Sequence, residues 1–276
     1  MGVATEVPRA FVPIPLPGKD YELRLPKGHL SVSQIELYLR CPEQYRRRYV
    51  AGEPDQYTAA QAEGSILAAV LEQLAVHRFT KGDPPSLEQA RKWYVKHHKA
   101  ECKEVRQWGE QTPLAMATRG ELFLRNLYAS GDVNSFNPIA VNGEPAAELE
   151  VKLPIAGVPM LGYVDLATRN RVWDTKVQSG KYFLKPDTSL QLSYYCVALG
   201  QPESGYIFFD KKSGKIEWIE ARTRDLPKTK LWLEITVSRV AMAISQGHFP
   251  VCNQSNNNLC SQEFCAYWHD CAGVYV

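Results

Sequence analysis

The sequence predicts an α/β fold, in which a helical region precedes a central β-sheet and a cysteine-rich tail follows. Between about 57 and 130, apolar residues recur at spacings of three and four, as they do on one face of a helix. Near 145 the pattern changes to short alternating or β-rich segments joined by turns. Cys260, Cys265 and Cys271 then fall within twelve residues, after a chain that uses cysteine sparingly.

The composition is that of a soluble globular protein, with 45% hydrophobic and 22% charged residues among 276. Lysine and arginine number 32 against 30 acids, and a net charge of only +2 neither requires nor excludes a nucleic-acid partner. No apolar run is long enough for a membrane span, and the first thirty residues lack the pattern of a secretory signal. We therefore expect no membrane partner, a cytoplasmic location, and cysteines that serve as thiols or metal ligands.

The first helix is predicted shortly after residue 30. Residues 1 to 30 contain five prolines without sustained periodicity, which predicts an extended arm on the surface. In SVSQIELYLRCP, Ser31 with Gln34 fits a capping box, and apolar residues follow at helical spacing. Pro42 interrupts or restarts this helix directly after Cys41.

The strands and the later helices follow in a fixed order. Three consecutive strands are predicted in AAELEVKLPI, VPMLGYVDLAT and RVWDTKV. Asp187 is placed to cap a helix through TSLQLSYYCVALG. SGYIFFD and GKIEWIEA predict two further strands with a turn at Lys212-Ser213-Gly214, and a long helix from about 226 to 246 ends at Gly247.

Polar side chains interrupt two predicted strands where a buried sheet would carry apolar ones. Asp165 closes its strand, while Asp174 and Lys176 share one face of the next strand. A short antiparallel turn would bring the two carboxylates and the ammonium together. Buried carboxylates repel each other unless a divalent cation lies between them, and such a cation can polarise a phosphodiester and its bound water. The alternative is a structural ion pair on an edge strand.

The wider motif set resembles the PD-(D/E)xK nuclease superfamily, and in particular its RecB-like branch. Glu148 lies upstream of Gly162-x-x-Asp165, and Gln191 and Tyr195 lie four apart on the predicted helix that follows Asp-x-Lys. SVSQIELYLRCPEQYRRRYV is similar to the opening motif of that branch. The resemblance implies six catalytic residues, namely Asp165, Asp174, Lys176, Glu148, Gln191 and Tyr195.

The resemblance also implies the architecture. It predicts a mixed sheet flanked by helices within a single nuclease domain over 31 to 276. The helical part would cover about 31 to 140, the sheet core about 144 to 222, and the C-terminal helix with a metal-cluster tail about 225 to 276.

Iron–sulfur members of the branch include the exonucleases of CRISPR adaptation and the AddB subunit of bacterial break-processing complexes. They take one cysteine from the Cys-Pro motif and three from the C-terminus. Here the resemblance implies a 4Fe–4S cluster on Cys41, Cys260, Cys265 and Cys271, which would tie the first helix to the tail. Four thiolates would equally accept zinc. Cys252, eight residues before Cys260, is the rival fourth ligand.

One position departs from the pattern of the branch. A helix after the Cys-Pro motif usually carries Gly, then His four residues later, then Leu-Glu, whereas GSILAAVLE has Ala68 at the histidine position. That histidine would be a metal ligand beside the two aspartates and the backbone carbonyl of Thr175. Its absence leaves three alternatives: a weaker Mg²⁺ site, a substitute carboxylate from Glu72 or Glu148, or a chain inactivated naturally or by engineering.

These features favour a metal-dependent DNA exonuclease that uses Mg²⁺ or Mn²⁺ and acts on DNA ends or single strands. Phosphate contacts and base stacking are expected from Tyr45, Arg46, Arg47, Arg48 and Tyr49. The alternatives are a DNA-binding module that no longer cuts and a zinc-stapled scaffolding protein. Compact chains of this family are often carried by bacteriophages and prokaryotes, with roles in DNA recombination, repair or spacer acquisition. The resemblance therefore implies a cytoplasmic location, which is the host cytoplasm if the chain is phage-encoded.

Overall fold

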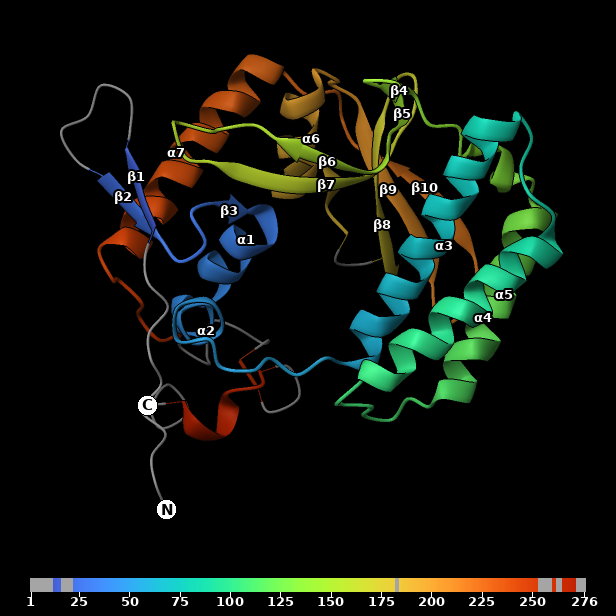
Figure 1. Ribbon diagram of the computed structural model, residues 1–276, viewed down its shortest axis with the longest axis horizontal. Coiled ribbons are helices and arrows are strands. Elements are labelled where there is room, and N and C mark those ends of the chain that lie inside the picture. The colour runs from blue at the N-terminus through green and yellow to red at the C-terminus, as the bar shows by residue number, and fades with distance from the viewer. Residues whose placement is uncertain (1–11, 16–21, 182–183, 253–259, 262–264, 272–276) are drawn as a thin grey trace. The chain divides into compact units, whose positions relative to one another are not determined.

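The computed structural model describes residues 12–15, 22–181, 184–252, 260–261 and 265–271 (Figure 1). The chain divides into two compact units. The terminal unit comprises Met1–Asp55, Lys152–Gly162 and Pro227–Val276, and the central unit comprises Gln56–Val151 and Tyr163–Leu226. The predicted single domain over 31 to 276 stays a prediction. None of the described helices is long and apolar enough to cross a membrane.

The terminal unit begins with a ladder, so the predicted arm contains regular structure. Strand β1 (Val12–Pro15) pairs antiparallel with β2 (Glu22–Leu25). The elements that follow are β3 (Leu30–Ser31), α1 (Val32–Arg40), α2 (Pro42–Tyr45), a π-helical segment (Arg46–Ala51), α7 (Leu226–Ser245) and a 3-10 turn (Trp268–Asp270).

Helix α1 begins and ends where the sequence predicts. The Ser31 side chain accepts the N–H of Gln34 at 3.3 Å, which caps the first turn, and Pro42 starts α2 directly after Cys41. Tyr38 is buried and donates its hydroxyl to the backbone carbonyl of His248 at 2.6 Å. This contact holds α1 against the segment that follows α7, and it fixes the helix junction that carries Cys41.

In the central unit, three helices pack together on one side (Figure 1). They are α3 (Ala59–Lys81), α4 (Leu87–Glu104) and α5 (Pro113–Ala129). Thr58 and Gln61 form a capping box at the start of α3. The helices bury their apolar faces against Trp173, Ile207 and Phe209 of the sheet, so this face of the sheet is covered.

The sheet is mixed, as the sequence predicts. Its strands are β6 (Ala147–Lys152), β7 (Met160–Ala167), β8 (Val172–Gln178), β9 (Ser204–Asp210) and β10 (Ile216–Glu220). The order is β10-β9-β8-β7-β3, with β6 also paired to β7. Strands β8 and β9 are parallel, whereas β7–β8 and β9–β10 are antiparallel. A small ladder of β4 (Ala140–Val141) and β5 (Glu144–Pro145) and a 3-10 turn (Asp132–Ser135) precede the sheet. The predicted α/β class is therefore confirmed.

Helix α6 (Leu190–Leu199) connects the parallel strands β8 and β9. Its N-cap is Ser189, whose side chain accepts the N–H of Leu192 at 3.2 Å. The prediction that Asp187 caps this helix is wrong, because Asp187 lies in a preceding 3-10 turn (Pro186–Thr188). Its carboxylate instead accepts the backbone N–H of Arg222 at 2.7 Å.

Candidate active site and cysteine cluster

Antiparallel pairing of β7 and β8 brings the two predicted aspartates together. Leu166 pairs with Trp173, so Asp165 and Asp174 occupy the next step of the ladder. Asp165 accepts the backbone N–H of Thr175 through Oδ2 at 2.6 Å. The Asp174 side chain is almost wholly buried. Alternation along the strands, which is visible in the sequence, therefore predicted this convergence correctly.

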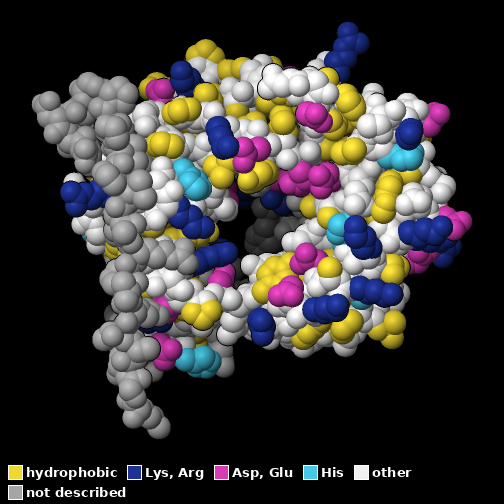
Figure 2. All heavy atoms as spheres, viewed as in Figure 1, with side chains coloured by type: hydrophobic (Ala, Val, Ile, Leu, Met, Phe, Trp, Pro, Cys, Tyr) yellow, Lys and Arg dark blue, Asp and Glu magenta, His cyan; other side chains and the backbone are white. Residues whose placement is uncertain are grey.

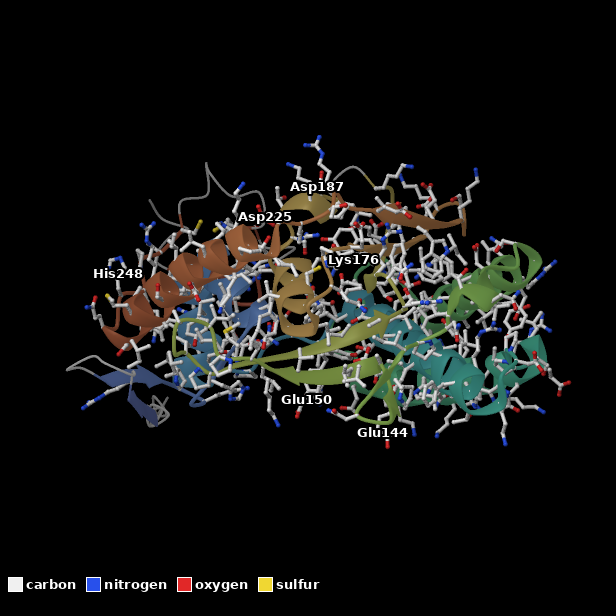
Figure 3. The ribbon with its side chains drawn as sticks, turned by 90° about the horizontal axis from the view of Figure 1, so that it is seen from above. Glu144, Glu150, Lys176, Asp187, Asp225 and His248 are labelled. Atoms are coloured by element: carbon white, nitrogen blue, oxygen red, sulfur yellow. The ribbon has the colours of Figure 1, made fainter. Side chains whose placement is uncertain are left out.

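Lys176 completes the cluster from the same strand as Asp174. Its Nζ lies 2.6 Å from Asp174 Oδ2 and donates to Gln191 Oε1 at 3.3 Å. Gln191 in turn donates to the Tyr195 hydroxyl at 3.1 Å. In Figure 3, Lys176 lies inside the layer of strands and helices, whereas Glu150 of β6 points out at its edge. Helix α6 therefore orients the ammonium, and four predicted site residues form one connected chain.

Glu148 approaches the aspartates from another strand, and Glu72 lies near Glu148. Glu148 lies on β6 with φ of 48°, a left-handed backbone that non-glycine residues rarely adopt. Burial raises the pKa of Glu148, and the charges of Glu72 and Asp174 raise it further. Glu72 lies on α3, one turn after the half-buried Ala68. Strand β6 thus directs the Glu148 carboxylate toward the aspartate pair, and helix α3 places Glu72 near Glu148.

The carboxylates repel each other in a buried setting. Burial raises the pKa of Asp165 well above its usual range, and the charges of Asp174 and Glu148 raise it further. Burial also raises the pKa of Asp174, against the opposing effect of Lys176. Burial lowers the pKa of Lys176, but the charge of Asp174 outweighs this and the net shift is upward. When they are ionised, the carboxylates of Asp165, Asp174 and Glu148 outnumber the single ammonium of Lys176, so the ionised cluster has excess negative charge.

Excess negative charge and oxygen donors suit a hard divalent cation. Asp165, Asp174 and the Thr175 carbonyl are the predicted ligands, and Glu72 or Glu148 is the predicted substitute for the histidine that Ala68 replaces. Within the described ranges, no group of three or more His, Cys, Asp or Glu side chains is placed so that it could hold a metal ion. The Lys176 ammonium and the Thr175 amide already engage the aspartates. The donor chemistry fits Mg²⁺ or Mn²⁺, and the ligand set stays a prediction.

Five cysteines gather in the terminal unit. Burial raises the pKa of Cys260, and the charges of the four neighbouring thiols raise it further. Those thiols belong to Cys252, Cys41, Cys265 and Cys271. Burial also raises the pKa values of Cys41 and Cys265. Thiols in this proximity match the donor set of an iron–sulfur or zinc site, although no three are in metal-holding positions among the described residues.

The tail that carries these cysteines is tied to the segment after α2. Arg47 donates to the backbone carbonyl of Asp270 at 2.8 Å and lies over the Tyr267 ring at 5.5 Å. The Tyr267 hydroxyl donates to the carbonyl of Glu53 at 3.3 Å. These protein contacts hold the segment that carries Cys271 close to the segment that follows Cys41.

The predicted DNA-contact segment is engaged within the protein. Arg46, Arg47 and Arg48 pair with the acids Glu43, Glu53 and Asp55 at 2.7 to 3.2 Å. Tyr45 is fully buried, so no face of its ring is open for base stacking. Tyr49 lies between Lys27 and Arg48, at 5.2 and 5.3 Å from its ring centre. Glu43 offsets Arg46 and Arg47 at helical spacing, whereas Glu53 and Asp55 reach Arg47 and Arg48 from further along the chain.

A mixed sheet with Asp165 on one strand and Asp174 with Lys176 on the next defines a nuclease-type α/β fold. The chain belongs to the PD-(D/E)XK nuclease superfamily, whose family model matches residues 29–272. A relative, the gene 69 protein of Mycobacterium phage D29, is 25% identical over 209 residues, 67% of this chain and 76% of the phage protein. A protein from Eubacterium rectale described as a candidate exonuclease superposes with a TM-score of 0.57 at 14% identity, over 89% of each chain, which shows the likeness of fold alone.

Proposed function

We propose that this protein is a metal-dependent DNA exonuclease that hydrolyses phosphodiester bonds at DNA ends or in single strands. The observation that carries the proposal is the mutually repelling pair of half-buried Asp165 and buried Asp174, with Lys176 ion-paired to Asp174 at 2.6 Å. Folding alone gains nothing from such a cluster, because buried like charges oppose stability. The phage relative supports a role in the cytoplasm of a prokaryote, which would be the host if the chain is phage-encoded.

Each residue of the cluster has a role in this proposal. Asp165, Asp174 and the Thr175 carbonyl would hold Mg²⁺ or Mn²⁺, which supplies a polarised phosphoryl oxygen and an acidified water. Lys176 places its ammonium where negative charge develops on the phosphate. Gln191 and Tyr195 act through Lys176 by fixing its orientation. Glu72 or Glu148 would be the substitute ligand for the histidine that Ala68 replaces.

The test uses end-labelled single-stranded and duplex DNA with Mg²⁺ or Mn²⁺. We expect the wild-type chain to shorten labelled DNA, Asp174→Asn to abolish cleavage, and Ala68→His to tighten Mn²⁺ binding measured by calorimetry. Ala69→His is the matched control, because it adds the same group about 100° away around α3. If neither the wild-type chain nor Ala68→His cuts, nuclease activity is refuted.

A second function is favoured by Ala68 alone. The protein would hold DNA without cutting it, as a binding module built on the same fold. DNA binding without turnover, unchanged by Ala68→His, would establish this alternative over the exonuclease.

We further propose that the tail holds a 4Fe–4S cluster through Cys41, Cys260, Cys265 and Cys271. Support comes from the proximity of these thiols to one another. Anaerobically purified protein should absorb near about 400 nm and contain iron. Cys41→Ser should remove this absorption, whereas Cys252→Ser should keep it, and the reverse result would make Cys252 the fourth ligand. If the purified protein is colourless and contains stoichiometric zinc, these thiols hold zinc and the proposed cluster is refuted.

A further inference from the structure

Helix α4 presents four lysines on one exposed face. The α4 lysine stripe comprises Lys92, Lys96, Lys99 and Lys103, and all four side chains are exposed. Their spacings of four, three and four residues place them within about 60° of one another around the helix. The opposite face carries Ala90 and Tyr94, which are buried. Figure 2 shows Lys and Arg side chains gathered along α4 on the face turned to the viewer.

The stripe lacks the acids that accompany an ordinary solvated helix face. Lys92 pairs with Glu88 at 2.8 Å, but Lys96, Lys99 and Lys103 have no hydrogen bond or ion pair with any residue that the structure describes. The i,i+4 neighbours within the stripe are other lysines, and like charges at that spacing destabilise a helix. The nearby Glu101 accepts from the Tyr57 hydroxyl instead. Helix stability therefore does not account for the stripe.

We propose that the α4 lysine stripe binds the phosphate backbone of DNA outside the active site, which rests on the proposed nuclease function. The stripe spans about 16 Å at the helical rise per residue. One strand of duplex DNA presents about five phosphates over that length. A membrane surface fits less well, because Val95 is the one exposed large apolar side chain of α4 among the described residues.

This surface differs from the segment that the sequence singled out. Arg46, Arg47 and Arg48 are each paired with an acid, so little of their charge is available to phosphates. The lysines of α4 belong to the central unit, as do Asp165 and Asp174. The α4 lysine stripe and the two aspartates therefore lie on the same compact unit.

The test measures the salt dependence of DNA binding. Binding of labelled duplex DNA is followed by fluorescence anisotropy in EDTA over a range of NaCl concentrations. In the triple variant Lys96→Gln, Lys99→Gln, Lys103→Gln, the slope of log affinity against log salt should become shallower by about 2 to 3. Affinity at low salt should fall about tenfold or more. The corresponding triple lysine-to-arginine variant should keep both values.

A control variant removes the same charge elsewhere. Lys81→Gln, Lys228→Gln, Lys230→Gln should leave the slope almost unchanged, and thermal melts should show that both triple variants are folded. If the two glutamine variants have equal slopes of log affinity against log salt, the proposal for the α4 lysine stripe is overturned. The proposed nuclease function would be unaffected by that result. If the wild-type chain does not bind DNA at all, the proposed nuclease function is refuted instead. Binding of anionic lipid vesicles that the stripe variant loses, with DNA binding unaffected, would also overturn the proposal.

Discussion

A buried ionic network joins α3 to α5 and to the end of β9, and its removal is a sharp test of what holds the central unit together. Glu63 on α3 is 3% exposed. It accepts two hydrogen bonds from Arg119, at 2.6 and 3.2 Å, and its Oε2 lies 2.7 Å from Lys211 Nζ. The charge of Lys211 is therefore offset by Glu63.

Glu63→Gln keeps the shape of the side chain and removes its charge. Two cations, with side chains 21% and 13% exposed, then lose their counter-ion. Breaking a buried pair on one side costs about 3–5 kcal/mol, and the partial exposure of the cations places the expected loss near the lower end, about 3 kcal/mol. The exposed pair of Arg91 and Glu121 is the control. Both side chains there are more than 40% exposed, so Glu121→Gln should cost about 1 kcal/mol or less.

The assay is urea unfolding followed by tryptophan fluorescence and far-UV circular dichroism. Coincident transitions justify a two-state free energy, and the m-value should be unchanged. A double-mutant cycle with Arg119→Met isolates the coupling between the two side chains. If Glu63→Gln and Glu121→Gln lower the free energy of unfolding by the same amount, within about 0.5 kcal/mol, the argument from burial fails.

Further predictions concern helix glycines, the carboxylate cluster and the tail. Gly120→Ala should destabilise the protein by about 1–3 kcal/mol or more, because the added Cβ would lie 1.9 Å from the ring of Tyr94 on α4. A Cβ at Gly64 would meet nothing within 4 Å, so Gly64→Ala should stabilise the protein by about 0.5–1 kcal/mol. Thermal melts of both variants measure these changes. Burial and neighbouring carboxylates raise the pKa of Asp165, so ionisation weakens the folded state as pH rises. In EDTA at pH 8, the free energy of unfolding of the Asp165→Asn variant should therefore be about 0.5–2 kcal/mol higher than that of the wild type. This difference should vanish as the pH falls below the pKa of an aspartate in the unfolded chain. Cys41→Ser should lower the melting temperature of metal-loaded protein, whereas Cys102→Ser should not.

Local patterns were enough to predict the sheet and the meeting of Asp165 with Asp174. Alternation fixes which face each side chain takes, and a short antiparallel connection fixes the register. The pairing of Arg47 with Glu53 and of Arg48 with Asp55 was not predictable, because these acids reach back from beyond the π-helical segment. The cap of α6 was misassigned for a related reason. Both Asp187 and Ser189 are good N-cap residues, and the tertiary contact with Arg222 decides between them.

The network around Glu63 also bears on the missing histidine. Gly64, Ala68 and Glu72 follow at intervals of four, so they lie along one side of α3. Glu63 fixes the first turns of this helix relative to the end of β9 through Lys211. We expect this anchoring to help position Glu72, which lies near Glu148 further along the same helix. A histidine introduced at Ala68 would emerge between the anchored turn and Glu72. Its effect on Mn²⁺ affinity should therefore fall when Glu63→Gln is added, although the two substitutions lie more than one helical turn apart.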